Sequence, residues 1–258
     1  MNKGTTVRRG IAAGIAALLM VAHMVLCQVE QVQRFIQQTV HHNQMVSCDT
    51  TLALSAVPSA LFVLYLLVCA WRKERHVLAC VSFFLLALCQ IPMMFKWMKQ
   101  LVVVLSYLIR SPQTAANLKE FTLLYTLYFL TSFICMVGYV LFAVDGLGRF
   151  SMRKASRVMA IVMAGLVCLK HLYELALLRG WLGNGGAWYL PNDPVKQLLI
   201  TLPCYACLAV FFFAVVQLPE APVAEGEAPA EDATPAENEA PVENETSADT
   251  DACTATEE

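Results

Sequence analysis

VMAIVMAGLVCLKHLYELALL, residues 158–178, is an apolar run that carries three ionisable residues, Lys170, His171 and Glu174, in its second half. A helix needs about 20 apolar residues to cross roughly 30 Å of hydrocarbon at about 1.5 Å per residue, and this run has that length. A charged side chain at the centre of a membrane helix costs about 2.5–3.5 kcal/mol on insertion scales. The stretch therefore predicts a membrane helix whose ionisable side chains face other helices or a polar cavity.

The rest of the chain repeats this apolar pattern. Hydrophobic residues make up 58% of the 258 residues and charged residues 15%, whereas soluble domains average about 45–50% and about 25%. The segments of spanning length fall at residues 10–27, 52–71, 77–95, 121–144, 158–178 and 196–217. We therefore predict an all-α integral membrane bundle of about six transmembrane helices, formed by residues 1–217.

Two of the predicted helices continue beyond the membrane. Apolar residues recur at helical spacing through residues 28–46, and residues 77–109 form one helical pattern interrupted only by Pro92. Ser111 and Pro112 have the types favoured at an N-cap and a first helical position, which would open a second long helix. We predict outward helical extensions, with residues 101–109 packed against the extension of the first helix. The alternative is that these segments lie flat on the membrane surface.

The distribution of Lys and Arg predicts the orientation of the chain. With the N-terminus inside, cytoplasmic segments hold ten of the eighteen basic residues and outer segments hold seven; Lys170 is the remaining one. Basic residues are enriched in cytoplasmic loops. We therefore expect a multi-pass protein of a bacterial-type plasma membrane with both termini in the cytoplasm.

Residues 218–258 have a different composition from the rest of the chain. They hold thirteen acidic residues and no Lys or Arg, so residues 1–217 have a net charge of +11 and the tail one of −13. A segment this polar cannot bury enough apolar surface to offset its ordering entropy, which predicts a disordered cytoplasmic tail. The tail would be a solvating appendage, or it would fold back on the basic inner loops or recruit a basic cytoplasmic partner. For the rest of the chain we expect the lipid bilayer and other membrane subunits as partners, and no nucleic acid.

Hydrogen-bonding residues lie at a similar depth in five of the six predicted spans, towards the outer side. This level is where an outward-facing polar cavity would lie, whereas the inner halves of the same helices are almost purely apolar. The residues predicted to line the cavity are His23, Gln90, Tyr125, Tyr128, Lys170, His171 and Glu174. The alternative is that these residues only form hydrogen bonds between helices, each of which stabilises the bundle by about 0.6 kcal/mol. Lys170 and Glu174, one helical turn apart, mark either a site or a structural contact.

Cys204 and Cys207 form a CxxC motif in the last predicted span. Such a pair is reactive at a helix N-terminus, where the helix dipole stabilises a thiolate. A helix starting at Thr201 would place the pair there, near Cys48, and predict redox activity. A helix starting at Asp193 would bury both cysteines two or more turns into lipid, as small apolar side chains.

Motifs of the common soluble enzymes are absent from the sequence. It contains no Walker loop, no GxSxG and no HExxH, and the adjacent His41 and His42 diverge on a helix, so we predict no metal and no cofactor. We expect the protein to transport or bind a small solute, alone or as a subunit of a larger complex, and this function is favoured over an enzymatic one. The alternatives are a membrane-embedded thiol enzyme and a scaffold protein without a small ligand.

Overall fold

A computed structural model describes residues 3–40, 54–69, 76–110, 115–181 and 193–216. Within these residues every regular element is a helix, which confirms the predicted all-α class. The long α-helices are α1 (Lys3–Thr39), α4 (Val77–Arg110), α5 (Ala115–Leu147), α6 (Arg153–Leu178) and α7 (Pro194–Val210). The shorter α3 (Ala56–Leu64) continues as a π-helix, η1 (Tyr65–Cys69), and α7 continues as a second π-helix, η4 (Phe211–Val215).

Five of these helices are long and apolar enough to cross a membrane. Four of them contain the predicted spans 10–27, 77–95, 121–144 and 158–178, and the fifth, which ends at Val215, covers most of the span 196–217. The remaining prediction, residues 52–71, corresponds to an apolar helix that is shorter than a full span, Ala56–Val68. The described residues therefore support five spanning helices and one shorter helix in place of six.

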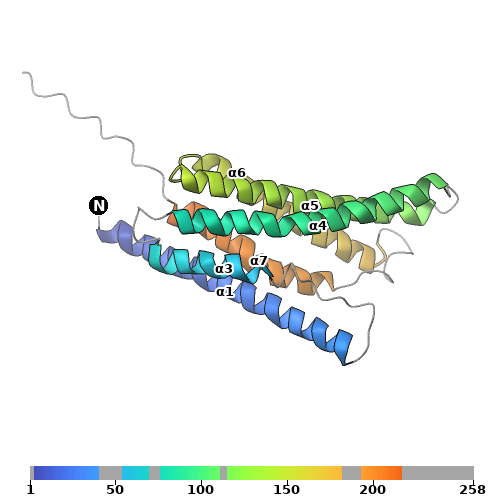
Figure 1. Cartoon of the computed structure of the whole chain (residues 1–258), viewed down its shortest axis with the longest axis horizontal. Coiled ribbons are helices and arrows are strands. Elements are labelled where there is room, and N and C mark those ends of the chain that lie inside the picture. Colours follow the sequence, from blue (N-terminus) through green and yellow to red (C-terminus); the bar gives the residue numbers. More distant parts are fainter. Residues whose placement is uncertain (1–2, 41–53, 70–75, 111–114, 182–192, 217–258) are drawn as a thin grey trace, which may run out of the picture. The chain divides into compact units, whose positions relative to one another are not determined.

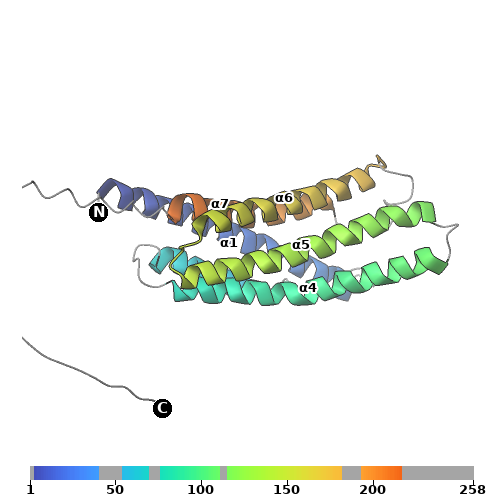
Figure 2. The same cartoon turned by 90° about the horizontal axis from the view of Figure 1, so that it is seen from above.

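The helices pack in chain order around a ring. α1 contacts α3, α3 contacts α4, and the order continues through α5, α6 and α7, which returns to α1 (Figures 1 and 2). Because α3 and η1 are short, they lie beside only the halves of α1 and α4 nearest the N-terminus (Figure 1). The start of α3 therefore lies beside the middle of α1 and α4, not beside their ends (Figure 1).

Aromatic residues fill the end of the ring that carries the N-terminus. Phe62 and Phe83 lie 4.8 Å apart between ring centroids, and Phe211 and Phe212 lie 4.9 Å apart. The Phe142 ring lies 4.5 Å from that of Phe212 at a tilt of 46°, and all five side chains are fully buried. These contacts between α3, α4, α5 and η4 close the core at this end.

The turn between α5 and α6 is held by a buried carboxylate. Asp145 accepts hydrogen bonds from the Met152 N–H and the Ser156 hydroxyl, both at 2.6 Å. Arg149 and Phe150 between them adopt positive φ angles of 54° and 60°, which non-glycine residues adopt rarely. The Asp145 hydrogen bonds offset this backbone cost and bring the two helices back antiparallel.

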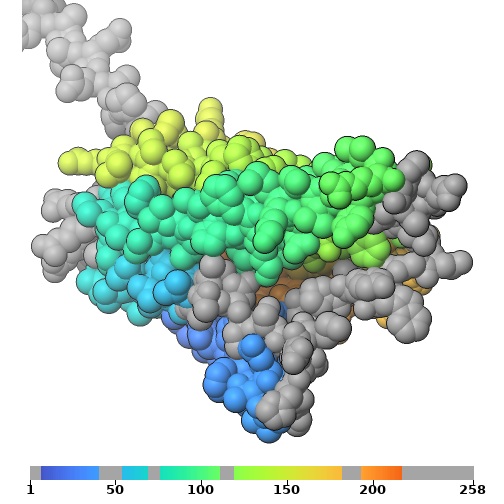
Figure 3. Space-filling view, turned by 45° about the vertical axis from the view of Figure 1, so that its right-hand side comes forward, coloured from blue at the N-terminus to red at the C-terminus, as the bar shows by residue number. Residues whose placement is uncertain are grey.

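Beyond the level of α3, the long helices continue as single elements. α1 runs to Thr39, through the first part of the predicted extension 28–46, whose residues 41–46 are not described. α4 runs to Arg110 through Pro92, as predicted. The predicted packing of residues 101–109 on the extension of α1 is not seen, since Phe35 and Val102 are each 59% exposed. Figure 3 shows the C-terminal part of α1 (blue) lying apart from the α4 surface (teal to green) on that face. Ser111, Pro112 and the predicted disordered tail, 218–258, lie outside the described residues.

Candidate functional site

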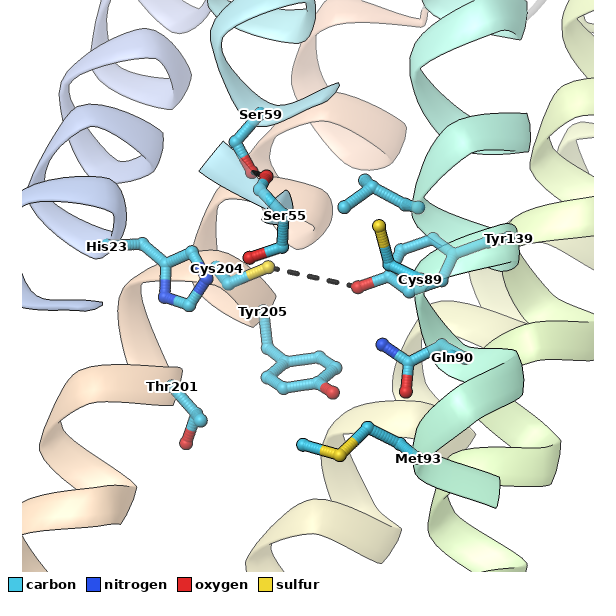
Figure 4. A pocket seen from close by; sticks show the side chains of 11 residues that line it. His23, Ser55, Ser59, Cys89, Gln90, Met93, Tyr139, Thr201, Cys204 and Tyr205 are labelled. Carbon is cyan, nitrogen blue, oxygen red and sulfur yellow. Dashed lines mark hydrogen bonds between the residues drawn. The ribbon is translucent and has the colours of Figure 1, made fainter. Parts of the chain in front are cut away.

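A cavity of about 130 Å³ lies inside the ring, at the level where α3 begins. Side chains from α1, α3, α4, α5 and α7 and from Ser55, the residue before α3, line it, so most of the ring contributes (Figure 4). Its hydrogen-bonding residues include His23, Ser55, Gln90, Tyr139, Thr201 and Tyr205. Leu86, Cys89 and Met93 supply much of the apolar wall. No Lys, Arg, Asp or Glu is among the described residues that line it.

His23 joins α1 to α7 at the edge of this cavity. Its Nδ1–H donates to the Ile200 carbonyl at 2.8 Å, which leaves Nε2 as an acceptor in the neutral ring. Pro203, in the next turn of α7, has no N–H to donate to the Leu199 carbonyl, which loosens the helix at this level. The Cys27 thiol lies 3.7 Å from the His23 ring nitrogens, one turn along α1. His23 is therefore held in position by the Ile200 carbonyl, and the Cys27 thiol lies within hydrogen-bond distance of its Nε2 acceptor.

The short α3 supplies two serines to the cavity. Ser55 is the residue before α3, and Ser59 is 2% exposed, with its hydroxyl donating to the Ser55 carbonyl at 2.8 Å. The first turn of α3 lies inside the bundle, so the side chains of Ser55 and Ser59 line the cavity. Serines in an apolar helix are common, so the sequence alone offered no reason to single them out. To predict that these serines line a cavity, one would need to know where α3 begins, and the sequence does not show this.

Two tyrosines and two cysteines make the wall between α5 and α7. The Tyr205 hydroxyl and the Cys135 thiol lie 3.3 Å apart, and the Tyr139 hydroxyl lies 4.0 Å from the Cys204 sulfur. Tyr139 is 4% exposed and reaches the cavity from α5 (Figure 4). These contacts hold α5 and α7 together beside the cavity.

A second polar cluster lies between α4, α5 and α6. Trp97 of α4 stacks on Tyr128 of α5 at 4.1 Å between centroids, and the Tyr128 hydroxyl donates a hydrogen bond to Glu174 of α6. The Lys170 ammonium lies 5.1 Å from the centre of the Tyr128 ring, in the range of a cation–π contact. Glu174 also accepts from His171 Nδ1 at 2.7 Å. Three helices are thus connected through Tyr128 and Glu174.

The predicted site residues therefore divide between two places. His23 and Gln90 line the cavity, whereas Tyr128, Lys170, His171 and Glu174 form the second cluster. Tyr125 lies beside that cluster, with its ring 6.1 Å from Trp97. Tyr205 lines the cavity and contacts Cys135, which lies within electrostatic range of Lys170, so the two places are neighbours.

The ion pair of Glu174 forms with His171, and Lys170 acts on Glu174 only at longer electrostatic range. His171 is 3% exposed and Glu174 is 4% exposed, on the face of α6 that packs inside the bundle. The Nε2 atom of His171 is buried and has no hydrogen-bond partner among the described residues. The ionisable residues of this helix thus avoid lipid by facing its neighbours.

Cys204 and Cys207 lie in the interior of α7. The helix begins at Pro194, and the Asp193 side chain caps it by accepting from the Val195 N–H at 3.0 Å. Both cysteines are free thiols, and they are 6% and 0% exposed, respectively. The pair therefore does not lie at the helix N-terminus, where the helix dipole would stabilise a thiolate. Cys48 lies outside the described residues.

Among the residues that the structure describes, no three His, Cys, Asp or Glu side chains converge as metal ligands would. No known protein family, curated protein or solved structure matches this chain. The functional argument therefore depends on the geometry of the cavity and of the second cluster.

Proposed function

We propose that this chain is a multi-pass plasma-membrane protein that binds a small neutral solute in the cavity at His23 and Gln90 and transports it. The observation that carries the proposal is a cavity of about 130 Å³ with hydrogen-bonding side chains from several helices around it. Ligand sites are typically apolar pockets with a few well-placed polar groups, and bundles often hold them between helices. In this proposal the cavity opens towards the outer side and both termini are cytoplasmic.

The lining of the cavity indicates the class of solute. Hydroxyl, amide and imidazole groups can exchange hydrogen bonds with an uncharged polar molecule. A charged solute would find no counter-ion among the described lining residues, and burying an unpaired charge is costly. The small volume limits the ligand to a compact molecule such as a short polyol or a simple amide.

Passage through the bundle requires a rearrangement of the aromatic residues below the cavity. Phe62, Phe83 and Phe211 are fully buried and close the core at the end that carries the N-terminus. Such closure on one side is compatible with a protein that opens to the two sides in turn. The loosened turn at Pro203 is the place where α7 would move.

A flux measurement tests this proposal. The full chain is reconstituted in liposomes, and entry of acetamide, glycerol and erythritol is followed by light scattering. We expect faster entry than in protein-free liposomes for the smaller solutes. Gln90→Leu removes a lining amide and should weaken solute binding about fivefold, the typical effect of one lost hydrogen bond.

Gln100→Leu is the matched control, because Gln100 is an exposed residue of the same helix. It should leave both rate and binding unchanged. Entry rates equal to those of protein-free liposomes, together with no saturable binding of any of the three solutes, would contradict the proposal. The scaffold alternative would then be favoured.

A further inference from the structure

Three arginines gather at the end of the bundle that carries the N-terminus. Arg9 lies on α1, and Arg153 and Arg157 lie on the first two turns of α6. Arg153 is within electrostatic range of both other arginines and of one carboxylate, that of Asp145. The cluster therefore has more positive than negative charge.

Some of the guanidinium donors in this cluster are already used. Arg157 donates from Nε to the Phe212 carbonyl at 2.8 Å and from Nη2 to the Val216 carbonyl at 3.3 Å. Arg153 donates from Nε to the Phe150 carbonyl at 2.6 Å. These bonds hold the last turn of η4 and the α5–α6 turn, so the positions of both guanidinium groups are fixed.

Other donors in the cluster have no partner. Arg9 Nε and Arg153 Nη1 are both buried, and neither makes a hydrogen bond among the described residues. Neither donor bonds to the nearby Asp145 carboxylate, whose oxygens accept from the Met152 N–H and the Ser156 hydroxyl. A buried donor without an acceptor is costly, and more so when it is charged. An anion bound beside these two arginines would offset the excess positive charge of the cluster.

We propose that Arg9 and Arg153 bind the phosphate group of an anionic phospholipid. Arginine matches phosphate because its planar fork can donate two parallel hydrogen bonds. The site lies at the helix ends, where headgroup phosphates lie in a bilayer. Val7 and Ile11, each two residues from Arg9 along α1, are 58% and 59% exposed, so this end of α1 presents apolar surface for contact with acyl chains. Basic pockets between membrane helices bind anionic headgroups in this way.

Thermal unfolding of the purified full chain in detergent tests this site. Short-chain phosphatidylglycerol, short-chain phosphatidylcholine or sodium phosphate is added, and the midpoint is measured. We expect phosphatidylglycerol to raise the midpoint and phosphatidylcholine to have little effect. Stabilisation by sodium phosphate at equal concentration would support the phosphate site and assign it to the free ion. The acidic residues 218–258 are present and compete at their natural concentration.

Substitutions identify the residues that bind. Arg9→Gln removes a donor that makes no hydrogen bond among the described residues, so the protein without added lipid should be no less stable. Its affinity for phosphatidylglycerol should fall roughly fivefold, the usual contribution of one basic residue at an anionic surface. Arg153→Gln should weaken binding similarly but also loosen the α5–α6 turn.

Arg8→Gln and Lys154→Gln are the matched controls, because each removes one positive charge at the same end from an exposed side chain. Both should keep nearly the affinity of the wild type. Equal losses in the controls and in Arg9→Gln would reduce the effect to general surface charge and overturn the site. The same holds if neither anion stabilises the wild type more than phosphatidylcholine does.

Discussion

Lys170, His171 and Glu174 of α6 have different partners that offset the cost of burying an ionisable side chain. Glu174 is 4% exposed and combines a carboxylate–imidazole pair with a hydrogen bond from Tyr128. Lys170 lies over the Tyr128 ring, which attracts a cation through its π face. Sequence spacing suggested a Lys170–Glu174 pair. Residues three and four apart both share a helix face, and in the structure it is His171, three residues before Glu174, that makes the ion pair at 2.7 Å.

Glu174→Gln should destabilise the folded protein more than Lys170→Met does. The first change leaves the Lys170 ammonium buried without a nearby anion, and breaking a buried pair typically costs about 3–5 kcal/mol. The second leaves Glu174 with two partners, His171 and Tyr128. Unfolding by SDS titration measures both free energies.

The double substitution Lys170→Met with Glu174→Gln removes both charges and should recover most of the lost stability. Leu172→Ala is the control: this residue is on the same helix but 56% exposed, so its effect should stay within about 0.5 kcal/mol. Additive losses in the double variant would show that the two charges do not share an environment. If solute flux also returns with the fold, the cluster is structural and not part of the solute path.

At the scale of the helices, small residues decide how closely α5 and α6 approach. A Cβ atom added to Gly138 of α5 would clash with the Met163 sulfur and lie 3.1 Å from Met159 Cγ, both on α6. Met163 is fully buried, so it has little space to move. Close approach of membrane helices through glycine is a general source of packing energy. The α5–α6 pair depends on this glycine.

Gly138→Ala should therefore lower the free energy of unfolding by about 1–3 kcal/mol, the usual cost of overpacking a filled core. Gly165→Ala on α6 is the matched control, since nothing lies within 4 Å of its added Cβ. That substitution should stabilise the helix by up to about 1 kcal/mol through higher helix propensity. SDS titration of the two variants tests the pair, and equal effects would contradict the predicted contact.

At the scale of the whole molecule, the distribution of basic residues predicts which end of the ring faces the cytoplasm. The N-terminus, the start of α6 and the end of η4 lie at one end of the ring. The basic residues 8, 9, 149, 153, 154 and 157 are near these helix ends. From the positive-inside rule we predict that this end faces the cytoplasm.

Cysteine labelling of intact cells tests this orientation. In a background in which the ten native cysteines are replaced, Trp181→Cys and Lys154→Cys each put a thiol at an exposed position, at opposite ends of α6. An impermeant maleimide should label position 181 in intact cells and position 154 only after permeabilisation. The reverse pattern would invert the proposed topology. Labelling of both positions in intact cells would show leakage and call for a repeat with a larger reagent.

The sequence by itself determined the class of the protein and the course of most helices. A long apolar segment with little charge predicts a membrane helix. Lipid offers no hydrogen-bond partners to the backbone, so its N–H and C=O groups must bond to one another within the helix. That reasoning found the long α4 through Pro92 and the buried polar face of α6. It predicted a span at residues 52–71, where the described residues hold a shorter apolar helix, Ala56–Val68, because apolar composition indicates that a segment can enter lipid but not where its helix begins.

Only the tertiary structure decided which polar residues share a site. Depth along each helix can be estimated from sequence, but the direction in which a side chain points around the ring depends on which helices are neighbours. His23 and Gln90 therefore meet at the cavity, whereas Tyr128, Lys170 and Glu174 meet elsewhere at a similar depth. Ser55 joins the cavity because α3 starts inside the bundle. These placements arise from packing between segments distant in sequence, which local patterns do not encode.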